Sequence, residues 1–218
     1  MADVPKIKFS RRGFLKGAGV TAATTVIESA SALAREANDV LHRDRAVGPD
    51  ALLVKLRVNG HEHSVMIEPR YTLADTLRDN LGLTGTKVVC DRGSCSACTV
   101  WIDKTPALAC MTLTIDAVGR EITTIEGISQ GDTMHPVQAA FVKHDAMQCG
   151  FCTPGMVMSC AALLDRTPNP DLDDVKHAVS GNLCRCGTYP KVFAATLDVA
   201  LQRRQGADLV LLATGREA

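Results

Sequence analysis

Aromatic side chains are scarce in this sequence, and its charges cancel. Phe, Trp and Tyr make up 4% of the 218 residues, so the stacking platforms that bind single-stranded nucleic acid are few. The formal net charge is zero, and no basic stripe runs along the chain. Both features argue against a nucleic acid as partner. A 46% share of hydrophobic residues still allows a real core in one or two domains.

Motifs of substrate chemistry and long apolar runs are missing as well. The sequence contains no nucleophile elbow, no phosphate loop, no dinucleotide fingerprint and no convincing pair of carboxylates. Its uncharged run at 17–27 is too short to cross a bilayer and is soon followed by Glu28. We therefore expect no integral membrane segment and no substrate site on this chain.

The first 34 residues have the features of an export signal. Residues 10–16 read Ser-Arg-Arg-Gly-Phe-Leu-Lys, a twin-arginine signature, and a weakly apolar run follows at 17–27. Ala32-Leu33-Ala34 supplies an A-x-A cleavage site. A short amphipathic helix with two incidental arginines is the alternative, but the three features occur in the right order. We predict a twin-arginine signal peptide at 1–34, a flexible lead-in at 35–51 and a periplasmic protein exported already folded.

Cysteine is the residue type around which the sequence is organised. Eight of the nine cysteines fall into two sets of four. The first set has the C-x4-C-x2-C…C spacing of plant-type ferredoxins, and Gly93 permits its loop to curl tightly. In the second set, a C-x2-C pair precedes a C-x-C pair. The first set is Cys90, Cys95, Cys98 and Cys110; the second is Cys149, Cys152, Cys184 and Cys186.

Soft thiolate ligands without accompanying histidine suit iron–sulfur clusters or zinc. Zinc knuckles usually pair cysteines two to four residues apart, whereas Cys184 and Cys186 are closer and the first set has three ligands in one loop. Such short spacings also fit disulfide geometry poorly. The pattern favours iron–sulfur clusters and leaves zinc open. Cys160 lies in an apolar helical pattern, and we expect it to be a buried free thiol.

Periodicity predicts a β-rich segment at 52–130, a helical segment at 131–206 and a tail at 207–218. Asn59-Gly60 is a hairpin signal, and Thr72 opens a capping box. Trp101 is expected in the sheet core or at an interface. The predicted strands are 52–58, 63–68, 99–103, 111–115 and 122–125, and the predicted helices are 72–82, 136–143, 153–164, 171–180 and 190–203.

Three motifs carry a resemblance to a known family. They are Cys90-Asp-Arg-Gly-Ser-Cys95-Ser-Ala-Cys98-Thr, Gln148-Cys-Gly-Phe-Cys-Thr-Pro-Gly155 and Gly181-Asn-Leu-Cys-Arg-Cys-Gly187. Over residues 52–205 the chain resembles the iron–sulfur subunit of the xanthine oxidase/aldehyde oxidoreductase family of molybdenum hydroxylases. The likeness is strongest to the exported bacterial type, in which this subunit is a separate chain.

The resemblance implies an α+β chain: a β-grasp plant-type ferredoxin domain followed by an all-α four-helix-bundle domain. Each domain would hold one [2Fe–2S] cluster, and Gln148 and Cys186 would contact molybdopterin on a large partner subunit. Electrons would pass onward to an FAD subunit or another acceptor. Ser96 departs from the family, because many members have glycine there.

Two other functions remain open at this stage. The chain can be a self-standing two-cluster electron carrier, or a zinc-stapled interaction module without redox chemistry. Arg185, between two predicted ligands, can donate to the cluster environment or form a structural salt bridge. The histidines are scattered without ligand spacing and are expected to be surface or core residues.

Overall fold

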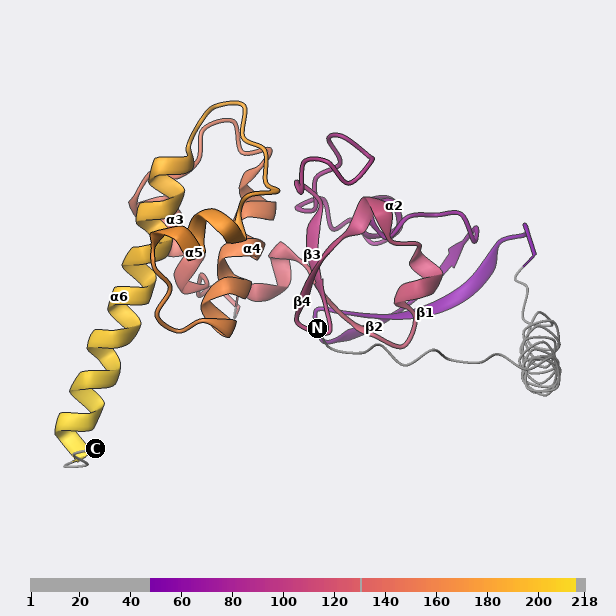
Figure 1. Cartoon of the computed structure of the whole chain (residues 1–218). Coiled ribbons are helices and arrows are strands. Elements are labelled where there is room, and N and C mark those ends of the chain that lie inside the picture. The colour runs from indigo at the N-terminus through magenta and orange to yellow at the C-terminus, as the bar shows by residue number, and fades with distance from the viewer. Residues whose placement is uncertain (1–47, 130, 215–218) are drawn as a thin grey trace, which may run out of the picture. The chain divides into compact units, whose positions relative to one another are not determined.

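The computed structural model describes residues 48–129 and 131–214, with side chains up to Gly206 (Figure 1). The predicted signal peptide at 1–34 and most of the lead-in at 35–51 lie outside the described residues. From Pro49 onward the described chain forms one compact unit. None of its helices combines the length and the apolar composition needed to cross a membrane.

The sheet begins with the predicted hairpin. Strand β1 (Leu52–Val58) pairs antiparallel with β2 (His61–Ile67), so the return strand starts two residues earlier than predicted. Asn59 and Gly60 have φ angles of 54° and 80°. Positive φ at both central residues is what a type I′ turn requires, and this confirms the Asn-Gly signal.

Three further strands complete a mixed sheet. Strands β3 (Thr99–Ile102) and β4 (Thr105–Leu108) form a second antiparallel hairpin. Strand β5 (Glu121–Thr123) lies between the two hairpins, parallel to β1 and antiparallel to β3. The order across the five-stranded sheet is β2-β1-β5-β3-β4.

The predicted strand at 111–115 is wrong. Two 3-10 helices, η3 (Ala109–Met111) and η4 (Thr114–Ala117), occupy this segment, and Leu113 makes only an isolated bridge to Thr72. The alternation of apolar and polar residues is real, but Met111 and Leu113 are exposed rather than packed on the sheet. The return strand of the hairpin is β4, whose proline at 106 is tolerated at a sheet edge.

The capping box predicted at Thr72 is present. The Thr72 side chain accepts from the Asp75 N–H, and the Asp75 carboxylate accepts from the Thr72 N–H, at the start of α2 (Leu73–Asp75). The helix continues as a π-helical turn, η2 (Thr76–Asn80). Leu73 and Leu77 are fully buried in the sheet core, which explains their helical spacing.

Four helices follow in the C-terminal half of the described chain: α3 (Pro136–Lys143), α4 (Thr153–Arg166), α5 (Leu172–Ala178) and α6 (Tyr189–Thr214). All four were predicted. Helix α6 extends well beyond the predicted end at 203, and the predicted tail therefore begins inside it. Residues 204–214 contain no proline and several good helix formers, so nothing local ends the helix.

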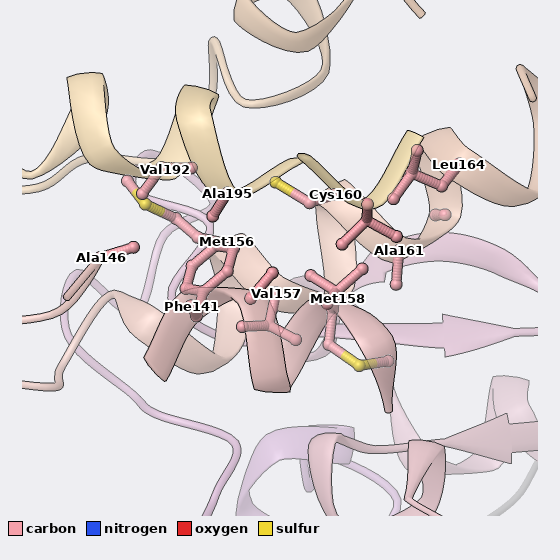
Figure 2. Close-up of a cluster of buried hydrophobic side chains, with 14 of the residues drawn as sticks. Phe141, Ala146, Met156, Val157, Met158, Cys160, Ala161, Leu164, Val192 and Ala195 are labelled. Carbon is pink, nitrogen blue, oxygen red and sulfur yellow. The ribbon is translucent and has the colours of Figure 1, made fainter. Parts of the chain in front are cut away.

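The described residues form two hydrophobic cores. One lies on the sheet around Leu56, Val100 and Ile122. The other lies among the helices, where Phe141, Met156 and Met158 are fully buried (Figure 2). Cys160 belongs to this second core and is buried, as predicted; burial raises its pKa to about 11.

Trp101 joins the sheet to the helices. Its ring lies on β3 but belongs to the helical core, and its Nε1–H donates to the carbonyl oxygen of Met158 on α4 at 3.0 Å. The expectation of an interface position is confirmed. A buried indole N–H needs an acceptor, and this one fixes α4 against β3.

Candidate metal centres

The loop that carries the first three cysteines curls through the left-handed region three times. The φ angles are 51° at Asp91, 71° at Gly93 and 54° at Ser96. The positive φ at Gly93 favours glycine, whereas a Cβ there would lie 3.0 Å from the exposed Met111 side chain, which can shift to make room. Ser96 adopts the positive φ despite its Cβ.

The four cysteines of the first set lie together as two pairs. The side chain of Cys95 lies close enough to Cys90 to affect its pKa, and Cys98 and Cys110 are neighbours in the same way. Cys110 reaches this position because the β3–β4 hairpin returns the chain, with the Ala109 N–H donating to the Cys98 carbonyl at 3.2 Å. The structure therefore brings together all four residues predicted from the spacing.

The cysteine environments differ within the first set. The backbone N–H of Arg92, together with the Cys95 thiol and the Ser94 N–H, lowers the pKa of Cys90 to about 7. The Ser94 N–H lies 3.3 Å from the Cys90 sulfur. Burial raises the pKa of Cys98 to about 12. Amide donors to a sulfur are the contacts that stabilise a metal-bound thiolate and tune a cluster.

The second set also forms two pairs, across a larger sequence separation. Cys186 lies close enough to Cys149 to affect its pKa, and Cys184 is the corresponding neighbour of Cys152. Cys152 is the N-cap residue of α4. Tyr189, the first residue of α6, closes the loop of the C-x-C pair: its hydroxyl accepts from the Cys184 N–H and donates to the carbonyl of residue 182, both at 2.8 Å.

Hydrogen bonds and burial shift cysteine pKa values in opposite directions in the second set. Burial alone raises the pKa of Cys184, but the hydroxyl and the N–H of Thr188 outweigh it and lower the pKa to about 7. The Thr188 hydroxyl is 3.3 Å from the Cys184 sulfur. The N–H of Phe151 lowers the pKa of Cys149, whereas burial raises that of Cys152 to about 12.

The pairing of the thiols fits a binuclear cluster. A [2Fe–2S] cluster is held by four thiolates shared between two irons, whereas structural zinc needs four ligands around one point. In residues 48–129 and 131–214, no three His, Cys, Asp or Glu side chains are close enough to hold a single metal ion. The assignment of the eight cysteines as cluster ligands stays a prediction, and their arrangement suits iron–sulfur clusters better than zinc.

The two cysteine loops are hydrogen-bonded directly to each other. The N–H of Leu183 donates to the Cys95 carbonyl at 3.1 Å, and the Asn182 side chain donates to the Ser96 carbonyl at 3.2 Å. The Asn182 side chain is itself held by the Ser159 hydroxyl at 3.0 Å. Leu183, which precedes the predicted ligand Cys184, is therefore hydrogen-bonded to Cys95, a predicted ligand of the other set.

Gly155 on α4 allows this approach. A Cβ at Gly155 would lie only 2.2 Å from the Ser96 carbonyl oxygen, a main-chain atom that cannot rotate away. Sequence reasoning quoted Gly155 and Asn182 within the family motifs but gave them no role, and it did not single out Ser159. Spacing carries no signal for contacts between loops so far apart in the chain.

Gln148 and Cys186, the predicted molybdopterin contacts, line the same cleft. The cleft has a volume of about 520 Å³, and Thr188 also lines it. Asp145 and Lys191 form an ion pair at its edge. The structure thus brings the two predicted residues together beside the second cysteine set, while their contact with a pterin stays a prediction.

Arg185 forms no ion pair with any residue that the structure describes, so the alternative of a salt bridge within the chain is not observed. Two of the histidines have ordinary structural roles. His135 caps α3 through its ring nitrogen, and His144 lies 2.8 Å from the carboxylate of Asp198 on α6.

The fold and the cysteine arrangement are those of a protein that carries two [2Fe–2S] clusters. A family model described as a 2Fe-2S iron-sulfur cluster binding domain matches residues 56–114, and one described as a [2Fe-2S] binding domain matches 124–197. A third, the twin-arginine translocation pathway signal sequence, matches 8–27. It confirms the predicted signal and indicates export by that route.

Curated relatives extend the likeness to whole subunits. The chain is 39% identical over 209 residues to the aldehyde oxidoreductase iron-sulfur-binding subunit PaoA of Escherichia coli, covering 89% of each chain. It is 44% identical over 149 residues to the nicotine 6-hydroxylase small subunit of Paenarthrobacter nicotinovorans, covering 68% of this chain and 90% of that one.

A solved structure agrees with these matches. A chain of quinoline 2-oxidoreductase from Pseudomonas putida 86 is 42% identical and superposes with a TM-score of 0.69, over 72% of this chain and 98% of the other. The present chain belongs to the family of iron–sulfur subunits of oxidoreductases of the aldehyde oxidoreductase and xanthine dehydrogenase type. It is a subunit of an oxidoreductase complex, as the resemblance predicted.

Proposed function

We propose that this chain conducts electrons from a molybdopterin held by a larger partner subunit to an FAD subunit or another acceptor. Residues 52–130 would form a β-grasp plant-type ferredoxin domain and residues 131–206 a four-helix bundle, each with one [2Fe–2S] cluster. The order of the two family models along the chain supports this division. The packing of α3, α4 and α5 against α6 or one another supports the bundle.

The observation that carries this function is the hydrogen bond between the cysteine loops. Leu183 precedes the predicted ligand Cys184, and its N–H donates to the carbonyl of Cys95, a predicted ligand of the other set. Covalent bonds and one hydrogen bond therefore join the two ligand sets without a gap. Two clusters, when bound, supply one-electron storage on either side of this connection.

The proposed electron transfer runs from the cleft that Gln148 and Cys186 line to the first set of cysteines. Cys186 shares its cleft with Gln148, and we assign that cleft to the pterin edge. Cys186 and the other three cysteines of the second set would hold the cluster at this end. Cys90, Cys95, Cys98 and Cys110 would hold the cluster at the outgoing end, since their loop contacts the second set through Cys95 and Ser96.

Substrate oxidation then belongs to the partner subunit. Relatives are named for aldehyde, nicotine and quinoline oxidation, so we propose an aldehyde or an N-heterocycle as the substrate class, hydroxylated with oxygen from water. The twin-arginine signal supports a periplasmic complex, with the signal peptide 1–34 removed after Ala34. That route carries folded proteins, which suits clusters inserted before export.

Metal analysis of the natively purified complex tests the proposal. We expect about four irons per copy of this chain, as two [2Fe–2S] clusters require, and about one molybdenum from the partner. Four irons without molybdenum would instead indicate a free two-cluster carrier. Stoichiometric zinc without iron would refute a redox function, and the preparation would then be colourless.

A further inference from the structure

A cleft of about 590 Å³ opens between the two cysteine loops, and we call it the inter-loop cleft. Two cysteines of the first set and three of the second line it. Two arginines, Arg92 and Arg185, line it from opposite loops. Arg92 follows the ligand Cys90 by two residues, and Arg185 lies between two ligands of the second set.

Apart from its cysteines, the inter-loop cleft is lined by only two charged side chains, and both are arginines. No Asp or Glu is among its lining residues, and neither arginine is within ion-pair distance of a carboxylate in the described part of the chain. The Nε–H of Arg92 donates to the Cys90 carbonyl at 3.2 Å, which holds its guanidinium beside the loop. Both charges are therefore held at the cleft without being neutralised inside the chain.

Apolar side chains surround these charges. Val89, Phe151 and Leu183 line the cleft and are exposed by 57%, 59% and 58%. Exposed apolar groups around a charged site displace part of its water and weaken the local screening of charge. A guanidinium also remains protonated at any working pH, so its charge at the cleft is permanent.

A cluster with four thiolate ligands is anionic, and each reduction adds one negative charge. Its potential depends on the net charge nearby. A fixed positive charge stabilises the reduced state more than the oxidised state, because the interaction grows with the charge of the partner. A cation shared by two clusters also offsets the repulsion between them when both are reduced.

We propose that Arg92 and Arg185 raise the reduction potentials of the two clusters and make it easier to hold an electron on both at once. This inference rests on the proposed function. Arg92 acts mainly on the cluster of Cys90 and Cys95, and Arg185 mainly on that of Cys184 and Cys186. Because the inter-loop cleft is common to both sets, each arginine also affects the other cluster, to a smaller extent.

The test is a redox titration of the purified complex, followed by the electron paramagnetic resonance signals of the two reduced clusters. Arg92→Gln and Arg185→Gln should each lower the midpoint potential of the nearer cluster more than that of the other. Arg92→Glu should produce about twice the shift of Arg92→Gln, because it changes the charge by two units rather than one. Arg185→Lys should retain most of the wild-type potential.

Arg57→Gln is the matched control. Arg57 is on β1, is paired with Glu121 at 3.1 Å and does not line the cleft, so its removal should leave both potentials unchanged. Iron is measured first in every variant. Wild-type complex without iron would refute the proposed function itself, independently of the arginines.

Full iron content with unchanged potentials in Arg92→Gln and Arg185→Gln would overturn the inference. So would equal shifts for Arg92→Gln and Arg92→Glu, since a purely structural role does not scale with charge. If Arg185→Gln loses iron, the two Arg92 variants alone test the inference. The Arg92 side chain is exposed, and only the backbone N–H of Arg92 contacts a predicted ligand sulfur, so these variants should keep their iron.

Discussion

Replacement of Gly155 by alanine should separate the two cysteine loops. The added Cβ would lie 2.2 Å from the Ser96 carbonyl oxygen and 3.2 Å from the Cα of Ala97. Contacts of a Cβ atom essentially never fall below 3.0 Å. To lengthen the distance from the new Cβ to the Ser96 oxygen to that value, α4 and the loop must move apart by about 0.8 Å. Both groups are main chain and cannot rotate away.

The cost of such overpacking is on the order of 1–3 kcal/mol. Alanine would by itself favour a helical position by about 0.5–1 kcal/mol over glycine, so the net loss is on the order of 1 kcal/mol, within a range of about 0–2.5 kcal/mol. The hydrogen bond from Asn182 to the Ser96 carbonyl, 3.2 Å long, should lengthen or break. Electron transfer between the clusters should slow in consequence.

Gly206→Ala is the control, because Gly206 also lies in a helix, α6, and has nothing within 4 Å of its Cβ position. Denaturant unfolding followed by circular dichroism should show a lower midpoint for Gly155→Ala and an unchanged or higher one for Gly206→Ala. The magnetic interaction between the reduced clusters should weaken only in Gly155→Ala. Wild-type stability and unchanged coupling in Gly155→Ala would refute the close contact.

Three further substitutions or conditions test other parts of the structure. Cys160→Ala should keep four irons per chain, because its buried thiol is no ligand, and should cost about 1 kcal/mol of unfolding free energy for the lost packing; a fall to two irons would contradict the ligand assignment. Gln148→Ala should slow turnover with full iron content, whereas iron loss would indicate a structural role. Asp198 has its pKa lowered by Lys143 first and then by His144. The ionised Asp198 carboxylate therefore stabilises the folded state fully above a pH of about 4, the pKa of an aspartate in the unfolded chain. This stabilisation is lost as the pH falls through the lower pKa of Asp198 in the folded state. Asp198→Asn should therefore make the free energy of unfolding depend less on pH in this acid range.

Local signals in the sequence determined much of this protein. The Asn59-Gly60 turn and the Thr72 capping box were predicted correctly, because each is decided by a few neighbouring residues. Spacing likewise placed the first three cysteines within one short loop, and their assignment as ligands stays a prediction. Helices α3 to α6 were found from periodicity and prolines, and the two sets of four cysteines from spacing alone.

Local patterns failed where distant contacts decide the conformation. Alternation at 111–115 suggested a strand, yet the segment turns into 3-10 helices because Cys110 faces its partner Cys98 and β4 already occupies the sheet edge. Likewise, nothing in the sequence ended α6 at a particular residue, and its end was predicted too early.

Only the tertiary structure decided which thiols pair and how the two loops meet. Cys149 lies beside Cys186, far away along the chain, because α4 and the loop before α6 converge. The approach of Gly155 to Ser96 and the shared cleft of Arg92 and Arg185 arise in the same way. Sequence spacing fixes which ligands a segment offers, whereas packing between segments fixes where those ligands point and what surrounds them.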